Sequence, residues 1–168
     1  MIPTTEYNPY YTSFITNLET EKSIIENLKI VQEDFETTLR TIPSNKENYA
    51  YADDKWTIKE LIQHLIDTER IFCYRALCFA RNDKTDLPGF DQDLFVINSI
   101  AQDRDYKDLL DEMNLLRKGT IQLFKSFRQE DLLKIGSGSG NKISVRALGM
   151  VMAGHQKHHL QVIKERYL

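Results

Sequence analysis

Residues 144–166 read SVRALGMVMAGHQKHHLQVIKER, and this stretch decides the class of fold. Mostly apolar positions recur in it on alternating three- and four-residue steps, which is the spacing of the core seam of a bundle helix. The seam contains Val145, Leu148, Met152, His155, His159 and Val162. Because Ser144 is a good N-cap residue, the sequence predicts a helix that begins there and runs to the C-terminus.

Three more long helices are predicted upstream, over about residues 12–39, 57–81 and 106–127. Thr57 and Glu60 have the spacing of a capping box at the start of the second one. A short helix is expected over about residues 92–101, and GSGSG at residues 136–140 is expected to be a flexible loop. No long segment alternates every two residues, so the pattern does not favour a sheet.

These patterns predict an all-α protein, a four-helix bundle with a short extra helix, formed by residues 1–168 as a single domain. The 41% hydrophobic and 28% charged residues are typical of a soluble globular chain. A net charge of −3 gives no basic footprint, so we expect no nucleic-acid partner. No apolar run approaches the ~20 residues of a membrane span and no signal peptide is visible, so we expect a cytoplasmic protein with no membrane partner.

The four histidines are the residues most suited to chemistry. His155 and His159 lie four residues apart on the core seam, so their rings can converge on one point in the HxxxH geometry of helical metal sites. His64 lies on the core-facing side of another helix, whereas His158 points about 100° away from His159. Three neutral imidazoles would make an open metal site, but hydrogen-bonded core histidines are the alternative that the sequence leaves open.

Charged residues near His64 offer further roles. Asp67 and Glu69 are candidates for a general base, and we predict that Asp67 is the catalytic one. Two alternatives stay open for Asp67: it orients a histidine ligand of the metal, or it is a solvated charge on the helix surface. Arg75 and Arg146 are able to bind an anionic substrate, although ordinary surface or ion-pair roles are favoured for both.

Two segments resemble the DinB/YfiT-like family of small bacterial helical-bundle proteins. They are KWTIKELIQHLIDTERIFCYRAL at residues 55–77 and SVRALGMVMAGHQKHHLQVI at residues 144–163. The resemblance extends from about residue 14 to 166 and includes a tryptophan, Trp56, ahead of His64. In one family pattern the second histidine of HxxxH is followed by Arg-Gly-Gln, but here Leu160 and Gln161 follow it, so that signature is only partly met.

The resemblance implies a four-helix bundle whose divalent metal is held by His64, His155 and His159, with His158 as a neighbour that is not a ligand. It also implies a homodimer. Imidazoles suit zinc, nickel, iron or copper, and we expect zinc or nickel, with iron or manganese as alternatives. The predicted function is hydrolysis of a small-molecule substrate through metal-bound water. The alternatives are a metal-dependent thiol S-transferase and a bundle that binds metal without catalysis or is purely structural.

Overall fold

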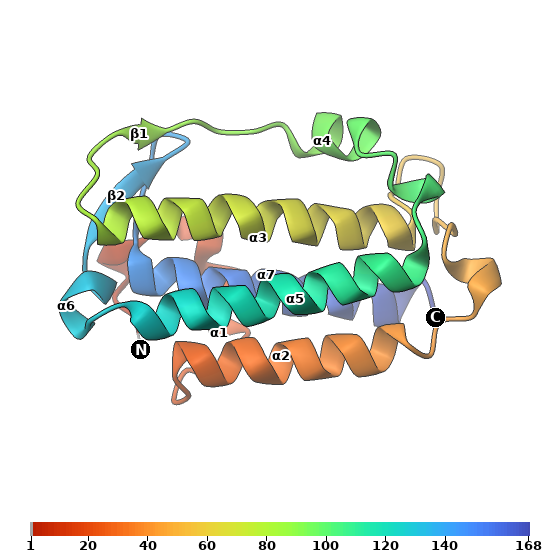
Figure 1. Cartoon of the computed structure of the whole chain (residues 1–168), viewed down its shortest axis with the longest axis horizontal. Helices are drawn as coiled ribbons and strands as arrows, with labels where there is room; N and C mark the ends of the chain where they lie inside the picture. The colour runs from red at the N-terminus through yellow and green to blue at the C-terminus, as the bar shows by residue number, and fades with distance from the viewer. Residues whose placement is uncertain (1) are drawn as a thin grey trace.

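Four long helices form the bundle in the computed structural model, which describes residues 2–168 (Figure 1). They are α2 (Ile24–Leu39), α3 (Ile58–Ala80), α5 (Tyr106–Ser126) and α7 (Val145–Arg166). Each of them packs against two others, in the ring order α2, α7, α3, α5. In Figure 1, α2 and α7 run from left to right, whereas α3 and α5 run from right to left, so the connection over residues 81–105 returns along the length of the bundle. The predicted fold class is confirmed.

Local sequence sets where two of the helices begin, as predicted. The Thr57 hydroxyl accepts a hydrogen bond from the Glu60 amide, and the Glu60 carboxylate accepts one from the Thr57 amide, which completes a capping box ahead of α3. The Ser144 hydroxyl accepts a hydrogen bond from the Ala147 amide at the start of α7. Both caps satisfy amides that have no partner within the helix.

The prediction of one helix over residues 12–39 was wrong, because the chain breaks it at residues 17–23. A short helix, α1 (Thr12–Thr16), precedes the break, and Ser23 caps α2 with Glu26. Buried Asn27 donates hydrogen bonds from its amide to three carbonyl oxygens of the connecting loop and so stabilises the turn. α1 packs against α7 instead of continuing into α2.

A small sheet lies at one end of the bundle, where the sequence pattern favoured none. Its strands are β1 (Asp86–Leu87), β2 (Ile135–Gly138) and β3 (Asn141–Ser144), with β1 parallel to β2 and β2 antiparallel to β3. The expected flexible loop at residues 136–140 is instead part of the β2–β3 hairpin. Ser139 and Gly140 both have positive φ, 56° and 71°, which is the conformation of a two-residue hairpin turn and explains the small residues there.

The remaining elements are short. They are α4 (Gln92–Asn98), which lies over α3 close to the predicted position, α6 (Gln129–Leu132), and 3-10 helices at Thr4–Glu6, Pro9–Tyr11, Ser44–Lys46 and Ala101–Asp103. In the described part of the chain no helix has the length and apolar character needed to cross a membrane.

A belt of buried polar side chains divides the apolar core into two clusters. The Arg117 guanidinium of α5 donates two hydrogen bonds to the Glu69 carboxylate of α3, at 2.9 and 2.6 Å, and one to the Leu28 carbonyl of α2. Gln156 of α7 donates to Gln32 of α2 at 2.8 Å. We call these side chains, Gln32, Glu69, Arg117 and Gln156, the polar belt.

The Arg117–Glu69 pair is expected to be essential for stability. Arg117→Met leaves the Glu69 carboxylate buried without its partner and is expected to lower the free energy of unfolding by about 3–5 kcal/mol. The double variant Glu69→Leu/Arg117→Met removes both charges and is expected to lose less than the sum of the single changes. Urea denaturation measures these differences.

Arg40→Met is the matched control, because Arg40 pairs with Glu36 on the exposed face of α2. It is expected to change stability very little. An Arg117→Met protein as stable as the Arg40→Met protein would contradict the prediction.

Candidate metal centre

Three histidines converge between α3 and α7. The Nε2 atom of His155 lies 3.2 Å from Nε2 of His64 and 3.0 Å from Nε2 of His159. Each histidine offers one ring nitrogen, and the three nitrogens all lie within 4.8 Å of one another. Within residues 2–168 this is the one group of three or more His, Cys, Asp or Glu side chains that meets this geometry. The structure therefore brings together the three residues that the sequence singled out.

The arrangement fits a metal better than it fits a hydrogen-bond network. Nε2 of a neutral imidazole has either one proton or one lone pair, so His155 can satisfy only one of its two histidine neighbours. Two imidazole nitrogens bound to one ion at about 2.0–2.1 Å lie about 2.9 Å apart at a right angle and about 3.3 Å apart at the tetrahedral angle. The observed separations of 3.0 and 3.2 Å lie between these values.

Aromatic rings hold the imidazoles in place. The Trp56 ring, just before the start of α3, packs on the His64 ring at a centroid distance of 4.6 Å. The Phe14 ring of α1 meets the His155 ring edge-on at 5.4 Å. α1 comes this close because α7 has a glycine, Gly154, at the crossing, where an added Cβ would lie 1.9 Å from the Phe14 carbonyl oxygen. His158 is exposed and lies outside the group, as the seam predicted.

Burial keeps these histidines neutral. It lowers the pKa of His64 to about 4 and that of His159 to about 3, and it lowers the pKa of His155 well below the usual value of 6.5. For His155 and His159, neighbouring imidazoles add a smaller repulsion in the same direction. Near neutral pH the rings are therefore unprotonated, which is the form that binds a metal.

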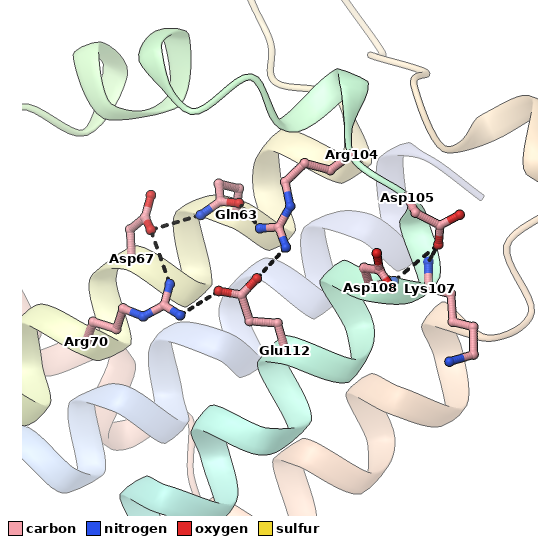
Figure 2. Close-up of polar contacts among 8 residues, drawn as sticks. All are labelled: Gln63, Asp67, Arg70, Arg104, Asp105, Lys107, Asp108 and Glu112. Atoms are coloured by element: carbon pink, nitrogen blue, oxygen red, sulfur yellow. Dashed lines mark hydrogen bonds and ion pairs between the residues drawn. The ribbon is translucent and has the colours of Figure 1, made fainter.

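Asp67 lies in a different polar network on the side of α3 that faces α5 (Figure 2). Gln63 donates a hydrogen bond to the Asp67 carboxylate at 2.9 Å, and the Arg70 guanidinium lies 3.8 Å from it. Arg70 and Arg104 both pair with Glu112 of α5, and Arg104 also donates to Gln63. Burial raises the pKa of Asp67. The structure does not bring this carboxylate to the histidines, and its catalytic role stays a prediction.

Two of the other three charged candidates, Glu69 and Arg146, are engaged in ion pairs. Glu69 binds Arg117 in the polar belt, so its carboxylate is held away from the histidine group. Arg146 pairs with Glu6 near the N-terminus, in agreement with the role that the sequence favoured for it.

A cavity of about 160 Å³ adjoins the histidines. Its wall includes His64, Thr68, Arg75 and His155, and its apolar side is formed mainly by Tyr10, Tyr11, Phe14, Phe72 and Phe90. Sequence reasoning assigned no role to Thr68 and favoured an ordinary surface or ion-pair role for Arg75. The available signal was helical spacing, because residues 64, 68 and 75 share one face of α3.

Fold and site together define a four-helix-bundle protein with a candidate three-histidine metal centre. The chain belongs to the DinB superfamily, whose family model matches residues 27–163. Among proteins of curated function, none matches the chain in sequence.

Two solved structures are similar to this fold. YfiT from Bacillus subtilis, described as a probable metal-dependent hydrolase with an unusual four-helix bundle topology, has a TM-score of 0.74 and 16% identity. The match covers 84% of this chain and 82% of that chain. A DinB-like protein from Bacillus subtilis, YjoA, has a TM-score of 0.58 and 16% identity, over 84% of this chain and 90% of that chain. At this identity the likeness shows the fold alone.

The neutral histidines predict a pH dependence for the metal-free protein. Its stability is expected to fall as the pH drops from about 6.5 towards about 3. Over this range histidines of the unfolded chain bind protons, whereas His64 and His159 in the fold resist protonation, so the unfolded state binds more protons and gains population. Urea denaturation at a series of pH values, with a chelator present, measures the effect.

Two histidine variants separate the contribution of the buried histidines from that of carboxylates that titrate over the same pH range. His64→Gln is expected to flatten the decline, and His158→Gln to leave it unchanged, because His158 is exposed. The prediction fails if His64→Gln and the wild type lose stability in parallel.

Proposed function

We propose that this protein is a metal-dependent hydrolase of a small-molecule substrate and that His64, His155 and His159 hold its divalent ion. The observation that carries the proposal is the convergence of the three Nε2 atoms between α3 and α7. The description of the similar bundle YfiT as a probable metal-dependent hydrolase adds support. Zinc or nickel suits three imidazoles best, with iron or manganese as alternatives.

A divalent ion in such a centre supplies a water molecule acidic enough to act as nucleophile near neutral pH and polarises a substrate carbonyl. The chain's own residues prepare the site for this chemistry. Burial keeps the imidazoles unprotonated, while Trp56 and Phe14 fix the orientation of two of them. His64 and His155 line the cavity, so a substrate in the cavity lies beside two of the three histidines.

The side chains around the cavity limit which groups can move a proton. Among the described residues, the wall of the cavity contains hydroxyl groups, including those of Tyr11, Thr68 and Ser139, but no Asp or Glu side chain. No carboxylate on this wall is therefore placed to act as general base, and the three imidazoles and the cavity are the parts of the site that hydrolysis requires.

Metal content is the first test. Protein purified without a nickel column is expected to contain about one divalent ion per chain, measured by elemental analysis, and His155→Ala is expected to lose it, because Nε2 of His155 contacts both other donors. His158→Ala is the matched control on the same helix and is expected to keep the ion.

The loaded protein is then assayed with esters, amides and thiol-transfer substrates. Hydrolysis that disappears in His155→Ala supports the proposal, whereas thiol transfer alone would make the protein an S-transferase. Wild type that contains no metal and takes up no zinc, nickel, manganese or iron would contradict the metal centre.

Asp67→Asn tests the role predicted for Asp67. Because Gln63 and Arg70 engage this carboxylate away from the histidines, the variant is expected to keep its metal and to change kcat/KM less than about threefold. A loss of about 100-fold or more in kcat/KM with the metal retained would support the predicted role of Asp67 as a general base.

The organisation of the chain is also part of the proposal. We propose a single domain, since helices from both halves of the chain enclose the core, and a cytoplasmic homodimer without a nucleic-acid partner. Light scattering measures the molar mass in solution, and a monomer mass at micromolar concentration would contradict the dimer.

A further inference from the structure

We propose that the cavity beside the histidines recognises a carboxylate on the substrate and that Arg75 is the residue that binds it. This inference rests on the proposed function, because it assigns the class of substrate that the same site takes. Arg75 differs from every other buried charged side chain in the described residues, because each of the others has an ion-pair partner.

Arg75 is buried, with 3% of its surface exposed, but no carboxylate among residues 2–168 lies within ion-pair distance of it, and Asp86 acts on it only at longer range. Its Nη2 atom donates to two neutral acceptors, the Pro88 carbonyl at 2.8 Å and the Ser139 hydroxyl at 2.9 Å. Its Nε atom is buried and has no hydrogen-bond partner there. Arg117, which is equally buried, has both a carboxylate and a carbonyl as acceptors.

Leaving a buried guanidinium without a counter-charge is costly. Burial also lowers the pKa of Arg75, because removal from water disfavours the charged form of the guanidinium. A second unsatisfied polar group lies on the same cavity wall, because the Thr68 hydroxyl is also buried without a hydrogen-bond partner in the described residues. Both side chains line the cavity that contains His64 and His155. One anionic ligand in this cavity would supply acceptors to both of them.

The α3 helix sets the direction in which such a ligand lies. Residues 64, 68 and 75 share one face, and helical side chains lean towards the N-terminus, so the long Arg75 side chain extends back towards Thr68 and His64. An anion bound by Arg75 therefore occupies one end of the cavity, and the rest of the ligand extends towards the histidines.

The β2–β3 hairpin holds the guanidinium from behind. Gly138 packs directly against it, since an added Cβ would lie 3.0 Å from Nε and 3.1 Å from Cζ of Arg75. Ser139 at the hairpin turn accepts one of its hydrogen bonds. The glycine- and serine-rich segment thus has a role that the fold alone does not explain, which is to position Arg75.

The charge and size of the cavity define the ligand. Arg75 is the one cation on the described wall, so it balances a single negative charge. Its planar fork pairs with both carboxylates and phosphates, and the charge balance therefore favours a carboxylate over a doubly charged phosphate. Aromatic rings form most of the apolar wall. A dry cavity of about 150 Å³ accommodates benzene, so a cavity of about 160 Å³ suits a body of that size.

Benzoate and its neutral counterpart benzamide are the probes, titrated by NMR and calorimetry into metal-free and zinc-loaded protein. Benzoate is expected to bind the metal-free protein about tenfold or more tightly than benzamide, because only the carboxylate pairs with Arg75. Arg75→Met is expected to remove this preference. Arg70→Met on the same helix is the matched control, because Arg70 pairs with Glu112 outside the cavity.

Thermal unfolding checks that Arg75→Met is folded, and Thr68→Val is the second variant, which keeps the side-chain shape and is expected to weaken benzoate several-fold. Equal binding of benzoate and benzamide, or no binding of benzoate, would overturn the inference. So would benzoate binding that requires zinc and survives Arg75→Met, because the carboxylate would then be on the metal.

The two proposals fail separately. Arg75-dependent binding of benzoate to a protein that takes up no metal would contradict the proposed function and leave this inference standing. Stoichiometric zinc uptake without a preference for benzoate over benzamide would contradict this inference and leave the proposed metal centre standing.

Discussion

The polar belt is the constraint on which the rest of the structure depends. Apolar side chains tolerate small shifts of one helix along another, but a buried charge or amide needs its partner at one position. The Arg117–Glu69 pair joins α5 to α3, and Gln156 and Gln32 join α7 to α2. The histidine group lies near the same level and joins α3 to α7. Arg117 also donates to the Leu28 carbonyl and so joins α5 to α2. Polar contacts therefore fix all four interfaces of the ring, and they do so at the height of the bundle where the site lies.

Close packing around α7 completes the geometry of the site. Gly154 lets the backbone of α1 cross α7 beside His155, and this contact brings the Phe14 ring to the imidazole. The Trp56 ring packs on the His64 ring in turn. Both aromatic side chains come from outside the four long helices, so the connecting segments close the site and the long helices supply the nitrogens.

The sequence predicted those features whose causes are local. The Thr57 cap and the seam through His155 and His159 depend on spacings within one helix, and the structure has both. The break at residues 17–23 was missed because Leu18 and Ile25, seven residues apart, keep the helical period across it, although Ser23 and Glu26 have the spacing of a capping box. Its other causes, the Asn27 hydrogen bonds and the packing of α1 on α7, form only in the folded chain. The hairpin was missed because the glycines of GSGSG give its strands too few side chains for a two-residue pattern.

Arg75 and Arg117 show why the site could be predicted only in part. In the sequence both are arginines within a helix, and nothing local indicates that Glu69 faces one of them while no described carboxylate faces the other. A chain able to pair one buried arginine has the means to pair or replace a second, so an unpaired one is a stability cost that folds retain mainly where function requires it. Arg75 shares its cavity with the Thr68 hydroxyl and two of the histidines. An anion that compensates this charge would therefore set the position of the rest of the ligand against the three histidines.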